Sequence, residues 1–255
     1  MRRERDKAIE RERYEKSSKS ILLNKVNLEK LSEYDALPRY LLEPYFFYKK
    51  LLEETIKKDH RVLEIGSGRG DLTGILLSTK ADITATDISP ISLSILNERY
   101  SAYDNLKTSV QDMENLSYEK EFDIFCSAGS LSYGSINNIL DQAKKVLKPE
   151  GIIICVDSLN NNPIYKVKRY IDFLRNKRSL STIFNMPTLK SLLEFNKDFK
   201  ILDIKFFGSI SWVCRLAEPF ISEARLAKFS TIIDKLILVK GSAYKFVIIA
   251  QIKSN

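Results

Sequence analysis

The stretch that decides the fold of this chain is Val62-Leu63-Glu64-Ile65-Gly66-Ser67-Gly68-Arg69-Gly70-Asp71-Leu72-Thr73. An apolar run ends in three alternating glycines, and the helical pattern DLTGILLST follows at once. We therefore predict a strand, a glycine-rich turn and a helix. Such a turn lets backbone N–H groups approach a nucleotide-like ligand where a Cβ atom would clash. The dinucleotide pattern G-x-G-x-x-G is not met, because Asp71 occupies the position of its third glycine.

A second short strand is predicted over Ala81-Asp82-Ile83-Thr84-Ala85-Thr86-Asp87. In a βαβ unit, an acid at the end of the second strand accepts hydrogen bonds from both ribose hydroxyls of a bound nucleoside. Asp87 fits that role. The alternative is that Asp87 only caps the helix that starts near Pro90, although Ser89 is the better cap.

The glycine segment resembles motif I of the class I S-adenosylmethionine-dependent methyltransferases, E/D-x-G-x-G-x-G, at every defined position. In that family the acidic residue steadies the loop near the methionine part of the cofactor, and the glycines pack against its amino-acid end. The resemblance implies S-adenosyl-L-methionine as cofactor, with Glu64, Gly66, Ser67 and Gly68 at its methionine end. It also implies that Ile88, next to Asp87, lies against the adenine ring.

Three further segments resemble motifs of the same family in the same order. Val110–Leu116 resembles the D-x-x-x-L segment, which implies that Asp112 binds the adenine amino group and Met113 lines the ring. Without the resemblance, these would be a loop acid and a core methionine. Glu121–Ser130 resembles motif IV, which implies that Ser127, at the end of its strand, belongs to the cofactor site. Val146–Asp157 resembles the LKPGG turn and the fifth strand, with Pro149 and Gly151 ending the preceding helix.

Strands and helices alternate through the centre of the chain, which predicts a parallel sheet with helices on both faces. The predicted elements are strands at 61–66, 82–87, 106–110, 122–127 and 151–157 and helices at 71–80, 90–102 and 135–147. Later strands at 201–207 and 244–252 fit the antiparallel C-terminal hairpin of the family. The expected fold class is therefore α/β, with a Rossmann-like, seven-stranded, mostly parallel sheet. The residues singled out above then meet at the carboxyl ends of the strands, where such sheets bind ligands.

The domain organisation expected from this pattern has two parts. Residues 1–60 form an N-terminal helical lid, as N-terminal helices do in the resembling family, and Tyr14 is a candidate to touch the methionine end. Ring packing is the alternative for Tyr14 and for Tyr34, Tyr40, Tyr45 and Tyr48. Residues 61–255 form the methyltransferase domain, with helical insertions at about 160–200 and 208–243. Helices are expected from Asn160-Asn161-Asn162-Pro163 to about Arg178, and after Pro187-Thr188.

Composition restricts the class of protein. The chain has 255 residues, of which 44% are hydrophobic and 29% are charged, as in ordinary globular proteins. No apolar run is long enough to cross a bilayer, and the charged N-terminus lacks the apolar core of a secretory signal. Three cysteines without a C-x-x-C spacing predict buried thiols in a cytoplasmic protein. With one histidine, no metal site is expected.

The net charge of +8 is unevenly distributed. Residues 1–30 mix both signs, which is typical of a solvated helix with i,i+4 pairs. A more one-sided basic cluster has only Asp172 as its acid and comprises Lys166, Lys168, Arg169, Arg175, Lys177 and Arg178. It fits contact with an anionic substrate, such as a phosphate or nucleotide-linked sugar, or with a membrane surface. A solvated basic face is the alternative.

Methyl transfer from S-adenosylmethionine requires alignment of the acceptor with an already activated methyl group. An oxygen acceptor also needs a base. His60 precedes the first strand, opposite the expected pocket, and is assigned a structural role. The catalytic candidates are Asp157, at the end of the fifth strand, and Tyr133, after the fourth. Asp157 alternatively caps the following helix.

The resulting functional prediction is methyl transfer to a small-molecule acceptor, by the small-molecule (methyltransferase type 11/25-like) branch of the family. O-methylation of a sugar or lipid-linked intermediate is favoured, because the segment after Asp157 resembles methyltransferases of bacterial polysaccharide biosynthesis. Nucleic acid is disfavoured as substrate, since Ser127-Ala128-Gly129-Ser130 replaces the N/D-P-P-Y/F motif of amino-methylating enzymes. The alternatives are a non-catalytic cofactor-binding scaffold, a nucleic-acid methyltransferase and, more distantly, a nicotinamide-dependent dehydrogenase.

Overall fold

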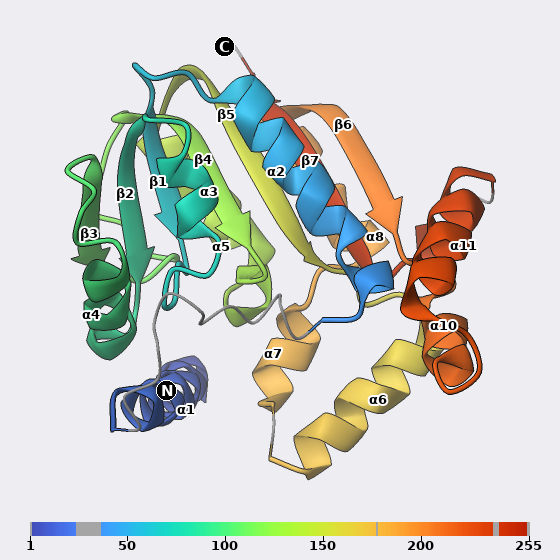
Figure 1. The fold of residues 1–255 in the computed structure, drawn as a ribbon. Helices are drawn as coiled ribbons and strands as arrows, with labels where there is room; N and C mark the ends of the chain where they lie inside the picture. The colour runs from blue at the N-terminus through green and yellow to red at the C-terminus, as the bar shows by residue number, and fades with distance from the viewer. Residues whose placement is uncertain (1, 24–36, 177, 237–239, 254–255) are drawn as a thin grey trace.

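A seven-stranded sheet in the order β3-β2-β1-β4-β5-β7-β6 forms the centre of the molecule (Figure 1). The computed structural model describes residues 2–23, 37–176, 178–236 and 240–253. β1 to β5 are parallel, and β7 lies antiparallel between β5 and β6. The strands are β1 (Arg61–Ile65), β2 (Asp82–Asp87), β3 (Leu106–Val110), β4 (Phe122–Ala128), β5 (Leu147–Ser158), β6 (Phe199–Phe207) and β7 (Lys245–Ile252). This arrangement confirms the predicted Rossmann-like fold.

Helices cover both faces of the sheet. The α-helices are α1 (Arg2–Leu23), α2 (Glu43–Thr55), α3 (Thr73–Leu77), α4 (Pro90–Arg99), α5 (Ile136–Val146), α6 (Pro163–Leu174), α7 (Leu180–Asn185), α8 (Leu189–Leu192), α9 (Phe195–Asp198), α10 (Ser211–Ala217) and α11 (Glu223–Leu236). Short 3-10 turns lie at η2 (Arg39–Leu41), η3 (Leu131–Tyr133) and η4 (Lys240–Ser242). One buried cluster joins α2 and α3 to the sheet, and another joins α5, α8 and α9 to its opposite face.

The apolar strands are explained by this double cover. Successive side chains of a strand point to opposite faces, so Val62 belongs to the α2–α3 side and Leu63 to the α5 side. Both are fully buried, as are Ile154 and Val156 of β5. A strand that is covered on both faces needs a continuous apolar run rather than an alternating one.

Helix starts follow their capping residues. Ser89, not Asp87, is the N-cap of α4, and its hydroxyl accepts a hydrogen bond from Ser92 N at 3.2 Å. Asn162 caps α6 by accepting from Ile164 N at 2.9 Å. Thr188 begins α8 with a capping box. These polar caps satisfy backbone N–H groups that have no partner within the helix.

Several predicted boundaries are wrong. β5 begins at Leu147 rather than 151, because buried Leu147 pairs with Phe122 before the register shifts. The turn predicted at Pro149-Glu150-Gly151 is thus an irregularity inside β5, with Glu150 at φ 64°. α6 ends at Leu174, just before left-handed Asn176 at φ 55°. In addition, α3 and α4 are shorter than predicted, α7 was not predicted, and the helix predicted after Thr188 is split into α8 and α9.

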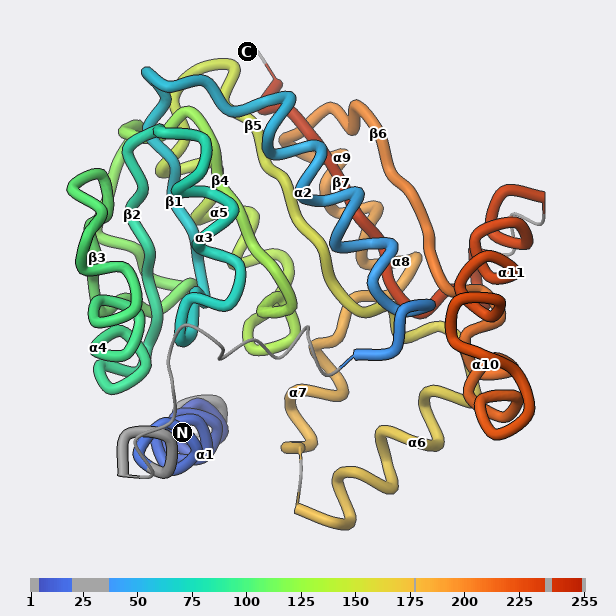
Figure 2. The backbone as a smooth tube through the Cα atoms, in the orientation of Figure 1, coloured from blue at the N-terminus to red at the C-terminus, as the bar shows by residue number. Residues whose placement is uncertain are grey.

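The N-terminal helix α1 lies across the ends towards which β1, β2 and β3 point (Figures 1 and 2). Its Ser18 hydroxyl lies 3.2 Å from that of Ser92 on α4, and both residues are buried. Within the part of the chain that the structure describes, no helix combines the length and apolarity needed to span a bilayer. Tyr34, considered above as a packing residue, lies outside the described residues.

Candidate functional site

A cavity of about 430 Å³ lies at the carboxyl ends of the strands. Its walls come from the loop after β1, the ends of β2, β4 and β5, the start of β7, and helices α1 and α7. It brings together ten of the eleven predicted site residues, namely Glu64, Gly66, Ser67, Gly68, Asp87, Ile88, Asp112, Met113, Tyr133 and Asp157. Residues chosen for separate reasons along the sequence thus share one space.

The glycine loop after β1 has the conformation that its sequence requires. Gly66 and Gly68 have φ values of 60° and 54°, in the left-handed region that side chains disfavour. A Cβ atom on Gly66 would lie 2.4 Å from Ser130 Cβ, whereas one on Gly68 would meet nothing within 4 Å. Among the described residues, the buried Ser67 hydroxyl has no hydrogen-bond partner. The loop therefore offers open space and an unsatisfied polar group, which fit a bound ligand.

Glu64 lies beneath this loop, at the end of β1. Its Oε2 accepts a hydrogen bond from the Thr73 hydroxyl at 2.7 Å. Burial raises the pKa of Glu64 from 4.5 to about 7, with the Thr73 bond opposing this and the charges of Asp87 and Asp71 adding to it. A positively charged ligand near Glu64 would favour its ionised form.

Asp87 connects the second strand to the glycine loop. Its Oδ2 accepts a hydrogen bond from Gly68 N at 2.9 Å, and its Oδ1 accepts one from Ser89 N at 2.8 Å. Burial raises the pKa of Asp87, and the backbone hydrogen bonds oppose that rise. Each carboxylate oxygen has a second lone pair, so two further donors can be accepted.

The loop after β3 contributes Asp112 and Met113 to the same wall. Asp112 Oδ1 accepts from Glu114 N at 3.0 Å, and its Oδ2 contacts Lys7 Nζ from α1. Lys7 also pairs with Glu114 at 2.7 Å. Lys7 was not among the predicted site residues, because its partners are more than one hundred residues away in the chain.

Ser127 is the predicted site residue that does not line the cavity, so its placement on the cavity wall is corrected. It is fully buried, and its hydroxyl lies 2.7 Å from that of Ser130. The side chain at 127 points into the core beneath the site, because neighbouring strand residues alternate between faces. Gly129, at φ 77° with open space beside it, and Ser130 form the wall instead.

The far end of the cavity is built by Asp157 and Lys245. Asp157 Oδ2 accepts from Leu131 N at 2.8 Å, and Oδ1 from Ser158 N at 2.5 Å. Burial raises the pKa of Asp157, while the positive charge of Lys245 opposes the rise. Lys245 Nζ donates to the Ser158 hydroxyl at 3.3 Å and lies 5.1 Å from the centre of the Tyr45 ring. Asp157 does not cap α6. The backbone groups that bond its carboxylate precede this helix in the chain, and the N-cap of α6 is Asn162.

Tyr133 meets α1 through Tyr14. The two hydroxyls are hydrogen-bonded, and the rings are edge-to-face with centroids 5.6 Å apart. Burial raises the pKa of Tyr133. At neutral pH its hydroxyl is therefore protonated, which suits a hydrogen-bond donor better than a base.

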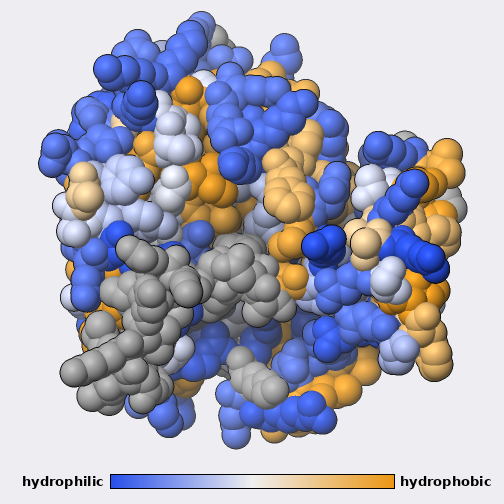
Figure 3. All heavy atoms as spheres, viewed as in Figure 1, coloured by the Kyte–Doolittle hydropathy of each residue, from blue (hydrophilic) through white to orange (hydrophobic). Residues whose placement is uncertain are grey.

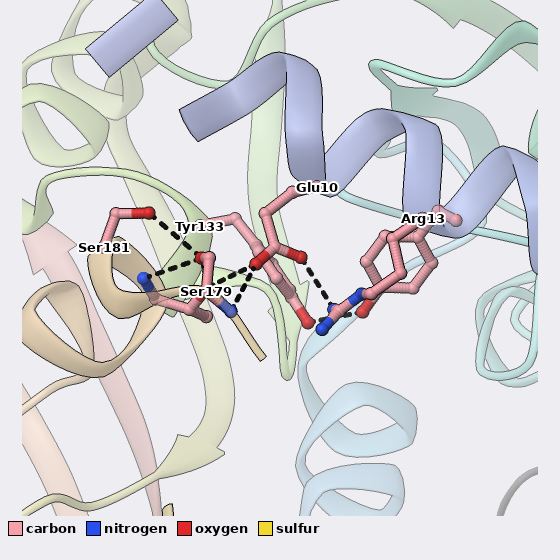
Figure 4. Close-up of polar contacts among 7 residues, drawn as sticks. Glu10, Arg13, Tyr133, Ser179 and Ser181 are labelled. Carbon is pink, nitrogen blue, oxygen red and sulfur yellow. Dashed lines mark hydrogen bonds and ion pairs between the residues drawn. The ribbon is translucent and has the colours of Figure 1, made fainter. Parts of the chain in front are cut away.

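A second connection holds α1 against α7. Glu10 Oε1 accepts from Ser179 N at 3.1 Å and from the Thr182 hydroxyl at 2.7 Å, and Oε2 pairs with Arg13 at 2.7 Å. Figure 4 shows Glu10 reaching from α1 between Arg13 and the Ser179 segment, close to Tyr133. Helix α1 thus forms one wall of the cavity through polar contacts at several points.

The basic cluster of residues 166–178 does not act as one unit. Arg169 is buried, with its guanidinium bonded to Leu159 O at 3.0 Å and to Asn160 Oδ1 at 2.7 Å. Arg178 lines the cavity. The exposed members are Lys166, Lys168 and Arg175, whereas Lys177 lies outside the described residues.

The remaining sequence candidates are structural. His60 accepts a hydrogen bond from Lys57 N at 3.3 Å, at the end of β1 opposite the cavity. Cys126, Cys155 and Cys214 are buried free thiols, as predicted. In the described ranges, no group of three or more histidine, cysteine or acidic side chains is arranged to hold a metal ion.

The strand order, the glycine loop and the acid at the end of β2 are those of class I S-adenosylmethionine-dependent methyltransferases. Residues 62–151 match a family model described as a methyltransferase domain. Residues 62–151 thus match a methyltransferase domain, and its motifs and strand arrangement resemble those of the class I S-adenosylmethionine-dependent methyltransferases, as the sequence predicted.

Two curated methyltransferases are similar to part of the chain. The protein YqeM of Bacillus subtilis (strain 168) is 28% identical over 129 residues, covering 48% of this chain and 51% of YqeM. The ubiquinone/menaquinone biosynthesis C-methyltransferase UbiE of Rickettsia akari (strain Hartford) is 27% identical over 164 residues, covering 58% of this chain and 62% of UbiE. The chain therefore spans about half of YqeM and less than two thirds of UbiE.

Among solved structures, the geranyl diphosphate C-methyltransferase of Streptomyces coelicolor A3(2) has the same fold. Its complex with Mg²⁺, geranyl diphosphate and S-adenosyl-L-homocysteine superposes with a TM-score of 0.60 at 14% identity, covering 82% of this chain and 79% of that one. At this identity the similarity establishes the fold and leaves the acceptor open.

Proposed function

We propose that this chain transfers a methyl group from S-adenosyl-L-methionine to a hydroxyl of a small acceptor, a sugar or a lipid-linked intermediate. The observation that carries the proposal is the single cavity, which runs from the glycine loop and Asp87 to Asp157 and Lys245. One end has the groups expected for a nucleoside and an amino acid. The other has the buried carboxylate of Asp157, which accepts hydrogen bonds from two backbone N–H groups and lines the cavity.

The cofactor end is assigned from the fit described above. Asp87 would bind the ribose hydroxyls, Asp112 the adenine amino group, and Ile88 and Met113 the ring faces. Gly66, Ser67 and Gly68 would pack against the amino-acid end, above Glu64. The cofactor supplies a methyl group activated by positively charged sulfur. The protein has to hold the acceptor in line with that methyl group and to exclude water.

The acceptor end contains the proposed base. Asp157 would take the proton of the acceptor hydroxyl as the oxygen attacks, and its raised pKa makes it a stronger base than an exposed aspartate. Tyr133 would donate a hydrogen bond to the acceptor. Lys245 and Arg178 line the same cavity, and their positive charges favour an acceptor with a phosphate or carboxylate group.

A carbon acceptor is the second candidate. UbiE and the Streptomyces enzyme are both named as C-methyltransferases. Carbon and oxygen acceptors both lose a proton, so the same aspartate serves either reaction. The two differ in the position of the added methyl group, which the product reveals.

We also propose a domain organisation, a cellular location and a substrate preference. Residues 1–60 would act as a lid, since α1 closes one wall of the cavity, and residues 61–255 as the catalytic domain with its two helical insertions. Buried free thiols fit a reducing compartment, and we propose a cytoplasmic location. Asp6, Glu10 and Arg11 mix both signs of charge at the cavity, which does not favour a nucleic-acid substrate.

Isothermal titration with S-adenosylmethionine, S-adenosylhomocysteine and NAD tests the proposal first. Binding of the first two with micromolar affinity, without NAD, supports it, and binding of NAD alone overturns it. Incubation with sugar and lipid-linked acceptors, followed by mass spectrometry, then locates the methyl group. Cofactor binding without transfer to any acceptor favours the scaffold alternative.

A further inference from the structure

Helix α6 has an apolar face that none of the described elements covers. Its exposed apolar residues recur at spacings of three and four, so they form one stripe along the helix: Ile164, Val167, Tyr170, Ile171 and Leu174. Val167 is 61% exposed and Leu174 is 76% exposed. The opposite face is attached to the protein through buried Tyr165 and Arg169. The stripe is therefore not a packing face of the described fold.

Helices α10 and α11 repeat this feature. Buried Cys214 and Leu226 hold them together around Tyr40. Their outer side carries the exposed apolar residues Leu216, Phe220, Phe229, Ile232 and Leu236. Phe220, in the turn between the two helices, is 87% exposed. A solvent-exposed phenylalanine inside a group of exposed apolar residues marks an interaction site rather than ordinary surface.

The two groups of side chains lie at the same end of the molecule. The Tyr165 hydroxyl of α6 is hydrogen-bonded to the Ser211 hydroxyl, the first residue of α10. In Figure 3 the orange side chains over α6 and over α10–α11 lie at the lower right, interspersed with blue ones. We call these ten apolar residues and the helices that carry them the α6–α11 surface.

Basic residues border both apolar stripes. On α6 these are Lys166, Lys168 and the following Arg175, and on α11 they are Arg225, Lys228 and Lys235; all six are exposed. The acids of the two helices are Asp172, Glu223 and Asp234. The carboxylate of Asp234 is already bonded to Gly208 N at 2.6 Å and Ser209 N at 2.9 Å. The surface thus has an excess of positive charge around an apolar centre.

From these observations we infer that the α6–α11 surface docks on an anionic membrane. Apolar side chains flanked by lysine and arginine are what a helix in the headgroup region of a bilayer needs, because the chains enter the acyl boundary while the cations meet lipid phosphates. The apolar side chains would fit a protein partner equally well. The exposed lysine and arginine residues beside them favour a negatively charged surface such as an anionic membrane.

The docked position would bring a lipid near the cavity. The segment after α6 lines the cavity: Arg178, the α7 residues Ser181, Thr182 and Asn185, and Met186, which follows α7. Docking itself does not depend on catalysis. The further step, in which the docked lipid supplies the methyl acceptor, rests on the proposed function.

Cosedimentation with lipid vesicles tests the inference on the full chain. The protein should bind phosphatidylcholine vesicles that contain phosphatidylglycerol and should bind pure phosphatidylcholine at least tenfold more weakly, with binding reduced at high ionic strength. The double variant Val167→Asp/Leu174→Asp and the variant Phe220→Ser should each lower the binding about tenfold or more. Tyr103→Asp places a negative charge on an exposed residue between α4 and β3, outside the α6–α11 surface, and should bind like the parent protein.

Three outcomes would overturn the inference: no preference for anionic vesicles, an equal loss of binding in Tyr103→Asp, or concentration-dependent dimerisation that the α6 variant abolishes while vesicles are not bound. Circular dichroism and S-adenosylhomocysteine titration of each variant show whether it is folded. Since vesicle binding needs no acceptor and no methyl transfer, its failure is distinguishable from failure of the proposed function.

Discussion

The backbone N–H of Gly68 donates a hydrogen bond to the Asp87 carboxylate at 2.9 Å. This bond ties the glycine loop after β1 to the end of β2, the strand next to it in the sheet. The residue proposed for the ribose therefore also sets the shape of the loop proposed for the methionine end. A substitution at Asp87 should therefore affect both the ribose contact and the conformation of the glycine loop.

Replacing Asp87 by alanine should weaken S-adenosylhomocysteine binding by about 1.5–3 kcal/mol, the usual range for hydrogen bonds to a charged group. The measurement is isothermal titration. Asp82→Ala, at the exposed start of the same strand, is the matched control and should bind normally. Unchanged affinity in Asp87→Ala would remove Asp87 from the cofactor site.

Two glycines of the loop should respond differently to alanine. Gly66→Ala forces a Cβ atom to 2.4 Å from Ser130 and strains a positive φ, so it should lower the free energy of unfolding by roughly 2–4 kcal/mol. Gly68→Ala meets nothing within 4 Å and should cost only about 1–2 kcal/mol for its φ. Its methyl group enters the cavity, so cofactor affinity should fall. Denaturant titration and calorimetry separate the two effects; equal stability losses would contradict the described loop.

Glu64 should make the stability of the free protein depend on pH. Its pKa is raised from 4.5 to about 7, so the folded state binds the proton more tightly than the unfolded state. Its contribution is fully present below about pH 4.5 and is lost as the pH rises towards 7. As the pH rises from 5 to 8, the free energy of unfolding of Glu64→Gln should therefore increase by roughly 2–3 kcal/mol relative to that of the parent protein. Urea titration at both pH values measures this; parallel pH profiles would show that Glu64 has an ordinary pKa.

Asp157→Asn should reduce the turnover of a working acceptor by about 10²–10⁴, the range for loss of a general base. The asparagine oxygen can still accept the bond from Leu131 N, whereas the bond from Ser158 N is lost, so the variant should fold and bind the cofactor with a somewhat lower stability. Tyr133→Phe should have a smaller effect, because the raised pKa keeps the Tyr133 hydroxyl protonated. Full turnover in Asp157→Asn would leave the reaction without this base.

Helix α1 should loosen when Glu10 is replaced. Glu10→Ala leaves Ser179 N and the Thr182 hydroxyl without their acceptor, at a cost of about 1–3 kcal/mol. Amide hydrogen exchange should rise in α1 and around residues 179–182 but not in β1 or β4. Glu12→Ala, an exposed position on the same helix, is the control. If only the site of substitution exchanges faster, α1 is not held through Glu10.

The central part of the fold could be predicted because its signals are local. The run from Val62 to Thr73 specifies a strand, a turn and a helix through apolar periodicity and glycine placement, and the structure has all three. The predicted ends of strands and helices were less accurate where contacts between distant segments set them. Leu147 joins the sheet because it pairs with Phe122, which no pattern within residues 135–157 encodes.

The sequence by itself determined the alternation of strands and helices in the central part, the glycine loop and the acids at the strand ends, since each depends on residues that are near one another in the chain. Only the tertiary structure decided which side chains complete the cavity. Lys7 meets Asp112, and Tyr14 meets Tyr133, across separations of 105 and 119 residues. Packing also decided which face of α6 stays exposed, because the helix has apolar residues on both sides and contacts with Ser211 and Tyr244 bury Tyr165. Such choices depend on distances between elements, which a linear pattern does not contain.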